Sequence, residues 1–128
     1  MPLIKSYDTF TDVKEHIKRG HILSAGATIV IPTTKIITVT DSFHKLDGST
    51  EDEVERINAT VTAPAGQMLV LQKTGATTVK IMSGAGSGNI NIKGDVTLND
   101  TNDTLTLMYS GTEWVALSSW SATVPTAD

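Results

Sequence analysis

Apolar and polar residues alternate along most of this chain after residue 20, and a period of two is typical of half-buried β-strands. The clearest case is NDTLTLMYSGTEWVALSSW, residues 102–120, where Leu105, Leu107 and Tyr109 share one face. A Ser-Gly-Thr turn then leads into Trp114. The pattern predicts a closing β-hairpin. Further alternating pairs are Ile37 with Val39, Val79 with Ile81, Ile90 with Ile92, and Val96 with Leu98.

The predicted strands recur about every ten residues, with turn residues between them. This spacing favours an all-β fold, an antiparallel β-sandwich or jelly-roll-like domain. No predicted strand is followed by a helix, which excludes parallel α/β folds. The run Met68–Leu71 differs from the others, because four consecutive apolar residues predict a strand that is covered on both faces.

Helical periodicity is confined to TFTDVKEHIKRG near the N-terminus. Phe10, Val13 and Ile17 form one narrow apolar stripe, Thr9 is placed to begin the helix, and Gly20 is placed to end it. A helix this short is marginal alone and must pack on something. The predicted organisation is therefore a segment with a short amphipathic helix (1–20), an antiparallel β domain (21–120) and a short tail (121–128).

Composition supports the all-β prediction and narrows the function. Threonine, a β-branched residue that favours strands, accounts for 20 of the 128 residues. The net charge of −4 provides neither the basic surface of a nucleic-acid-binding protein nor a polybasic membrane anchor. The absence of cysteine excludes disulfides and thiolate metal sites. With no apolar segment of signal-peptide or membrane-spanning length, we expect a protein made in a cytoplasm.

Three motifs could suggest chemistry, and each has a simpler interpretation. SGAGSGN (83–89) precedes a predicted strand, whereas a phosphate loop precedes a helix, so its glycines are expected to permit a positive-φ hairpin connection. His44 lies in DSFHKLD without a nucleophile elbow, and we expect it to be half-exposed in a loop or at a strand end. The acids between Glu51 and Glu55 predict a solvated loop, with a cation site as the alternative. We therefore expect no enzyme, no cofactor and no metal.

The two tryptophans are the remaining candidates for a binding role. Trp114 is expected to cap the core, although stacking on a ligand is an alternative. Trp120, six residues later, would share its face if the strand alternates without interruption. Because Trp120 ends the strand beside a polar tail, we expect it to contact another subunit or, alternatively, a sugar.

Five blocks, in order, resemble a β domain common in tailed-phage virion proteins. They are ITVTDSFH with His44, ERINATVT with Ile57 and Asn58, APAGQ with Gly66 and Gln67, GSGNI at 86–90, and DTLTLMYSGTEWVAL at 103–117. The resemblance covers residues 36–117. One departure is Ala59-Thr60, which stands where the family has a double glycine after Ile-Asn.

The resemblance implies a place on the virion surface, since the family occurs at fibre and spike tips and in small capsid-attached proteins. The resembling region begins at residue 36 of a chain that starts with methionine, so no fibre shaft is expected. We therefore expect a capsid decoration (cement) protein, made in the host cytoplasm. It would be a homotrimer that binds the major capsid protein on the outer head surface, bridges capsomers and stabilises the head.

The residues expected to contact the capsid or another subunit are Leu3, Ile4, Tyr7, Phe10, Val13, Ile17 and Trp120. The N-terminal stripe could equally pack on its own sheet, and the sequence leaves both possibilities open. The alternative function is a receptor- or glycan-binding tip module of a tail or head fibre, with a host glycan as partner. Neither function requires nucleic acid or a membrane.

Overall fold

The computed structural model describes residues 24–86 and 88–120, without the side chains of Ser119 and Trp120. This part contains strands and turns but no helix, so the all-β prediction is confirmed. The predicted N-terminal helix lies outside the described residues. The strands are β1 (Ile29–Val30), β2 (Ile36–Val39), β3 (Phe43–Asp47), β4 (Glu53–Val54), β5 (Arg56–Ala59), β6 (Met68–Thr74), β7 (Val79–Ile81), β8 (Ile90–Asn91), β9 (Val96–Leu98), β10 (Thr104–Tyr109) and β11 (Trp114–Trp120).

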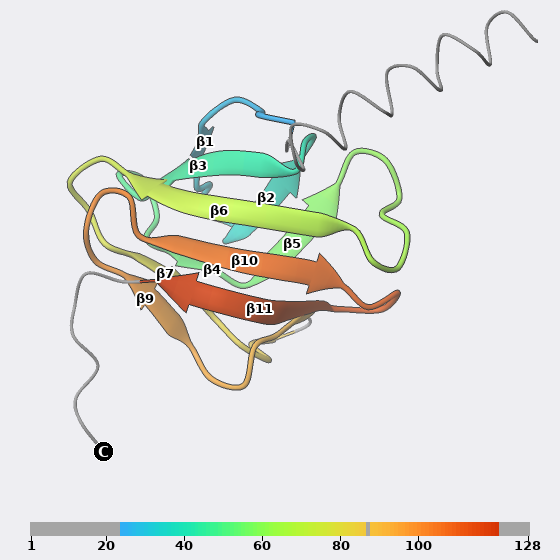
Figure 1. Ribbon diagram of the computed structural model, residues 1–128. Helices are drawn as coiled ribbons and strands as arrows, with labels where there is room; N and C mark the ends of the chain where they lie inside the picture. Colours follow the sequence, from blue (N-terminus) through green and yellow to red (C-terminus); the bar gives the residue numbers. More distant parts are fainter. Residues whose placement is uncertain (1–23, 87, 121–128) are drawn as a thin grey trace, which may run out of the picture.

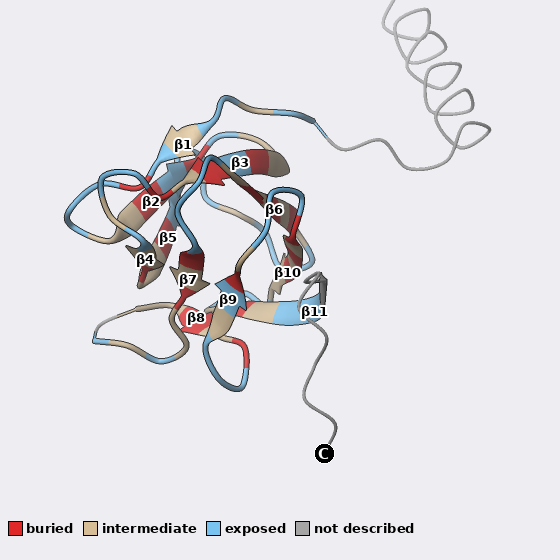
Figure 2. Cartoon of the chain, turned by 90° about the vertical axis from the view of Figure 1, so that its left-hand side faces the viewer, coloured by how far each residue is buried: buried red, intermediate tan, exposed pale blue. Residues whose placement is uncertain are grey.

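The strands form three sheets that surround a common interior (Figures 1 and 2). The largest has six strands in the order β1-β3-β6-β10-β11-β8. A two-stranded sheet pairs β2 with β5, and a three-stranded sheet has the order β4-β7-β9. Consecutive strands therefore belong to different sheets through much of the chain.

Two successive turns of chain give the molecule a solenoid-like arrangement. The first turn contains β2, β3 and β4, and the second contains β5, β6 and β7. Each strand of the second turn lies parallel to its counterpart in the first, so that Ile37 pairs with Ile57, His44 with Leu71 and Val54 with Ile81. Strands β9 and β10 then run antiparallel to β7 and β6.

The prediction of an antiparallel sandwich or jelly roll is therefore wrong, because the sheets are mixed. Parallel neighbours need a long crossover, which is usually a helix. Here the strands of the other two sheets make the crossover instead. Alternation fixes which face of a strand is buried but does not fix its partner or direction, so both topologies fit the same pattern.

The interior is filled by the inward-facing residues of all three sheets (Figure 2). The alternating pairs predicted to share a face point into it, except that Val96 and Tyr109 are only partly buried against it. Trp114 is 2% exposed, which confirms that it caps the core. The buried apolar residues are Ile31, Ile37, Val39, Leu46, Val54, Ile57, Leu69, Leu71, Val79, Ile81, Ile90, Ile92, Leu98, Leu105, Leu107 and Trp114.

His44 is buried in β3, so the prediction of a half-exposed strand-end residue is wrong. Its ring is satisfied entirely by the backbone. Nε2 accepts the N–H groups of Thr40 (3.0 Å) and Asp41 (3.1 Å), and Nδ1 lies 2.8 Å from the carbonyl oxygen of Ala27. A buried polar ring is stable where each nitrogen has a partner. His44 thus joins the β2–β3 turn to the stretch before β1.

The acidic stretch is more ordered than a solvated loop, because β4 lies within it. Glu53 forms an ion pair of 2.7 Å with Lys35, and its carboxylate raises the pKa of Lys35 by accepting a hydrogen bond from the ammonium group. The glycine-rich stretch turns at glycines with positive φ, as predicted. The predicted hairpin connection is wrong, because the strands on either side, β7 and β8, belong to different sheets. Gly84 and Gly86 have φ values of 71° and 52°, which few other residues adopt.

The predicted closing hairpin is formed by β10 and β11 and is confirmed. Thr106 pairs with Ser118 but Leu107 pairs with Ala116, so Leu117 is an extra residue in a β-bulge. The bulge removes the unbroken alternation on which a common face for Trp114 and Trp120 was predicted. Leu117 is 51% exposed.

Candidate functional site

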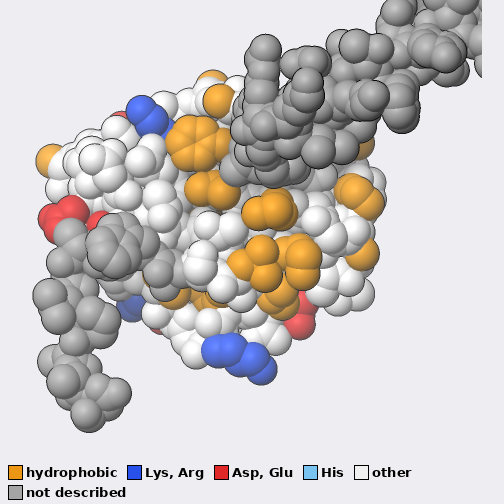
Figure 3. All heavy atoms as spheres, viewed as in Figure 1, with side chains coloured by type: hydrophobic (Ala, Val, Ile, Leu, Met, Phe, Trp, Pro, Cys, Tyr) orange, Lys and Arg blue, Asp and Glu red, His pale blue; other side chains and the backbone are white. Residues whose placement is uncertain are grey.

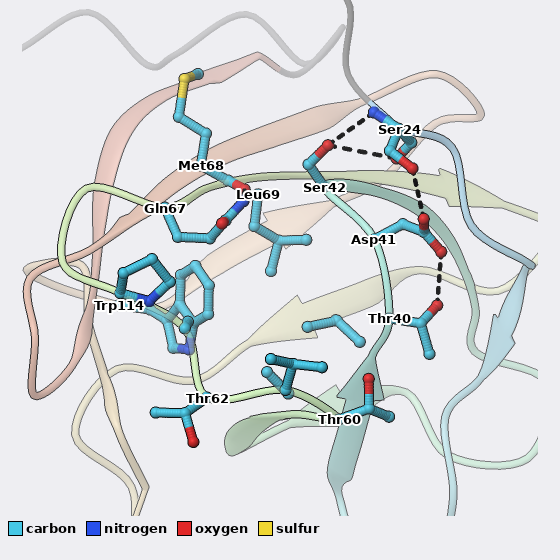
Figure 4. Close-up of a pocket in the computed structure, with 15 residues that line it drawn as sticks. Ser24, Thr40, Asp41, Ser42, Thr60, Thr62, Gln67, Met68, Leu69 and Trp114 are labelled. Carbon is cyan, nitrogen blue, oxygen red and sulfur yellow. Dashed lines mark hydrogen bonds between the residues drawn. The ribbon is translucent and has the colours of Figure 1, made fainter. Parts of the chain in front are cut away.

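A recess of about 290 Å³ opens between the β2–β3 turn and the loop 60–67 that leads into β6 (Figure 4). Trp114 contributes to its wall from the start of β11. Val39, Ala59 and Leu69 add apolar surface, and the hydroxyls of Thr60 and Thr62 come from the loop. The recess therefore combines an apolar wall with a rim of small polar groups.

Asp41 holds one side of the rim in place through two short hydrogen bonds (Figure 4). The hydroxyl of Ser24 donates to its Oδ1 at 2.5 Å, and the hydroxyl of Thr40 donates to its Oδ2 at 2.7 Å. These donors, Ser24 first, lower the pKa of Asp41 because they stabilise the carboxylate. The rim thus carries a negative charge at neutral pH.

A second, smaller recess of about 150 Å³ also reaches Trp114. Its polar lining includes Arg56 and Asn58, whose side chains form a hydrogen bond of 2.9 Å. Tyr109 packs on Trp114 with ring centroids 5.0 Å apart. Asn89 closes the site from the loop before β8. Trp114 therefore separates an apolar recess from a polar one, and Ala59, Thr62 and Ala63 line both.

The larger recess is suited to binding. Among the described residues that line it, Asp41 is the only carboxylate, whereas glycoside hydrolysis by the common mechanisms needs two facing carboxyl groups. An apolar wall with hydroxyls at the rim suits an inserted apolar side chain or one face of a sugar ring. Trp114 is too deeply buried to offer its full face to a ligand.

Two further properties concern only the described residues. Within residues 24–86 and 88–120, no three acidic or histidine side chains are arranged to hold a metal ion. The same part of the chain contains no helix with the length and apolar character needed to cross a membrane.

Only the backbone of Trp120, among the sequence-predicted contact residues, belongs to the described structure. Leu3, Ile4, Tyr7, Phe10, Val13 and Ile17 lie outside the described residues. The backbone of Trp120 ends β11 opposite Thr104, and its side chain is not described. Sequence reasoning missed the recess, because its lining residues come from segments that are far apart in the sequence. The small residues Ala59 and Ala63, which leave space beside Trp114, are the signal that could have indicated it.

Comparison with known proteins adds no relative. No family model matches the chain, and no curated protein matches it.

Proposed function

We propose that this protein is a bacteriophage capsid decoration protein that binds the outer surface of the head and stabilises it by bridging capsomers. The observation that carries the proposal is the ordered set of five sequence blocks, because they contain residues on which the fold depends. Residues that fix a backbone conformation are harder to match by chance than exposed residues.

The backbone contacts made by residues of these blocks support the proposal. His44 holds three backbone groups, and Gly66 adopts a φ of 94° where the chain turns into β6. The amide of Gly66 donates to the carbonyl of Tyr109, and the amide of Tyr109 donates to the carbonyl of Gln67. The third block therefore joins the last block, the β10–β11 hairpin.

The proposed partner is the major capsid protein, and the proposed assembly is a homotrimer. Each subunit then needs only weak contacts with the shell, because several contacts made together raise the overall affinity. The proposed contact residues are Leu3, Ile4, Tyr7, Phe10, Val13, Ile17 and Trp120. No catalytic group is required for this role.

Binding to undecorated heads of the encoding phage tests the proposal. We expect the full chain to co-sediment with heads at a fixed ratio to the capsid protein and to raise the temperature at which heads disrupt. A chain lacking residues 1–20 should bind more weakly while remaining folded. A folded protein that does not bind heads would contradict the proposed function. Full binding by the shortened chain would contradict only the proposed N-terminal contacts.

A glycan-binding tip module is the second candidate, and the recess beside Trp114 is the observation that favours it. It predicts binding to a host surface polysaccharide that is lost in Thr62→Trp, where the larger side chain would fill the recess. Trp120→Ala tests the other predicted sugar contact. If both variants bind heads normally and no glycan binds the parent protein, the decoration function stands and this candidate is excluded.

A further inference from the structure

An apolar surface lies on the outer side of the six-stranded sheet. We define the outer apolar face as Phe43, Met68, Val70, Met108 and Val115. Strand alternation places Met68 and Val70 opposite the buried Leu69 and Leu71 of β6. None of the five residues belongs to the core cluster or to the residues packed against it.

These residues are neighbours across four strands. Phe43 of β3 pairs with Val70 of β6, Met68 of β6 pairs with Met108 of β10, and Met108 pairs with Val115 of β11. Hydrophobic side chains gather over β6 and β10 in the space-filling view (Figure 3). An apolar patch that spans several strands is uncommon on a monomer and usually has an occupant.

The sequence independently predicts that this face is covered. Met68–Leu71 is an unbroken apolar run, which is typical of strands that are buried on both faces. The described structure buries Leu69 and Leu71 but leaves Met68 and Val70 half-buried. The outer face of β6 must therefore be covered by residues outside the described part or by another molecule.

The described chain begins at the border of this face. The carbonyl oxygen of Ser24 accepts the N–H of Phe43 at 3.0 Å, and the N–H of Ser24 donates to Ser42 Oγ at 2.8 Å. Ala25 bridges to Phe43 as well. The preceding segment consequently leaves the domain beside Phe43, one end of the outer apolar face.

The length of that segment fits the width of the sheet. The three steps from β3 to β11 span about 14 Å at the usual strand spacing. A helix over residues 9–19 would be about 16 Å long. Residues 20–23 can reach about 13 Å, which is enough to carry the chain from Ser24 over the edge of β3.

We propose that the N-terminal segment of the same chain occupies the outer apolar face, with Phe10, Val13 and Ile17 against the sheet. Ile17 lies near β3, Val13 over β6 and β10, and Phe10 towards β11. The polar side of the helix, with Lys14, Glu15 and Lys18, faces water. Residues 1–8 then emerge at the β11 edge, so Leu3, Ile4 and Tyr7 are the N-terminal residues left for an external partner.

Cross-linking tests this placement well, because the chain has no native cysteine. A full-length Val13→Cys and Met108→Cys double variant is treated with a short bismaleimide at low protein concentration. We expect an intramolecular link, identified by mass spectrometry of the joined peptides, at a several-fold higher yield than in two controls. Glu15→Cys with Met108→Cys moves the first thiol to the polar side of the helix. Val13→Cys with Thr97→Cys moves the second thiol to an exposed position on β9.

The outcomes separate the possible occupants. Equal yields in all three variants would overturn the proposal. Links that join differently isotope-labelled copies would show that the N-terminal segment of one copy covers the outer apolar face of another copy. Removing residues 1–20 provides a second measurement: the domain should stay folded and bind several-fold more of a hydrophobic dye, and unchanged dye binding would also count against the proposal. Neither measurement uses heads, so both can fail or succeed whether or not the protein decorates a capsid. If the placement holds, Phe10, Val13 and Ile17 pack on their own sheet and are removed from the proposed capsid contacts.

Discussion

At the scale of single residues, His44 shows how a buried polar group can determine the backbone around it. Because Nε2 accepts two backbone N–H groups, it carries no proton, and Nδ1–H donates to the carbonyl of Ala27. The ring thereby satisfies three backbone groups that would otherwise be left without partners, at a cost of about 1–3 kcal/mol for each one that is buried. Gly26 lies directly against this ring, where no side chain fits.

We predict that Gly26→Ala destabilises the protein by about 1–3 kcal/mol, because the added methyl group would overlap the imidazole of His44. Urea unfolding measures the change. The matched experiment introduces Gly26→Ala into His44→Ala, where the ring is absent and the further loss should fall below about 1 kcal/mol. An equal loss in both backgrounds would show that the ring is not the cause.

The pH response of Asp41 provides a second residue-scale prediction. Its pKa is lowered on folding, so the stability that it contributes is present above the ordinary aspartate pKa of about 3.9. This contribution is lost as the pH falls through the lower folded value. We expect the stability difference between the parent protein and Asp41→Asn to be largest near neutral pH and to shrink below about pH 4.

The cause can be tested by following the Asp41 carboxyl group by NMR. Ser24→Ala should raise the pKa of Asp41 more than Thr40→Val does, because the Ser24 hydroxyl is the larger cause of the lowered value. The reverse order of the two variants would contradict this assignment.

At the scale of elements, the Asn89 side chain makes the two backbone hydrogen bonds that a neighbouring strand would make to β5. Ile57 of β5 donates its N–H to Asn89 Oδ1 at 3.0 Å, and its carbonyl accepts from Asn89 Nδ2 at 2.8 Å. The carbonyl of Asn89 accepts the N–H of Trp114. A single asparagine thus joins the two-stranded sheet to the start of β11, beside the polar recess.

We predict that Asn89→Ala costs roughly 1–3 kcal/mol for each backbone group of Ile57 that loses its partner. Asn91→Ala, two residues along in β8, is the matched control. It removes one half-buried side-chain hydrogen bond to Glu113 and should cost under about 1 kcal/mol. Thermal and urea unfolding compare the two variants, and similar losses would exclude the strand-like role of Asn89.

The same elements show what the sequence could predict. Alternation identified the buried faces of β2, β7 and β10, because a period of two is set by the pleat itself. It could not reveal that β2 pairs in parallel with β5, since partner choice depends on how the chain turns through the other sheets. The bulge at Leu117 and the ring contacts of His44 are tertiary features with no local signal. The common face predicted for the two tryptophans therefore lost its basis, and the exposure predicted for His44 was wrong. The recess was missed for the same reason.

At the scale of the whole molecule, the described residues form one compact unit whose sheets share a single core. Apolar surface is left on the outside of the six-stranded sheet and at Leu117, near the end of β11. If the N-terminal helix occupies the outer apolar face, the β11 end remains the best surface for contacts between copies. Trp120 belongs to the same end of the strand.

We predict that the full chain is a homotrimer, with a mass by light scattering of about three times 13.6 kDa. Because assembly stabilises the folded state by mass action, the unfolding temperature should rise as protein concentration increases. Leu117→Asp should weaken assembly by placing a charge in the contact, whereas Val61→Asp, at an exposed loop residue beside the recess, should leave it unchanged. A monomer with a concentration-independent unfolding temperature would contradict the trimer. If Val61→Asp weakened assembly and Leu117→Asp did not, the contact between copies would involve the loop beside the recess and not β11.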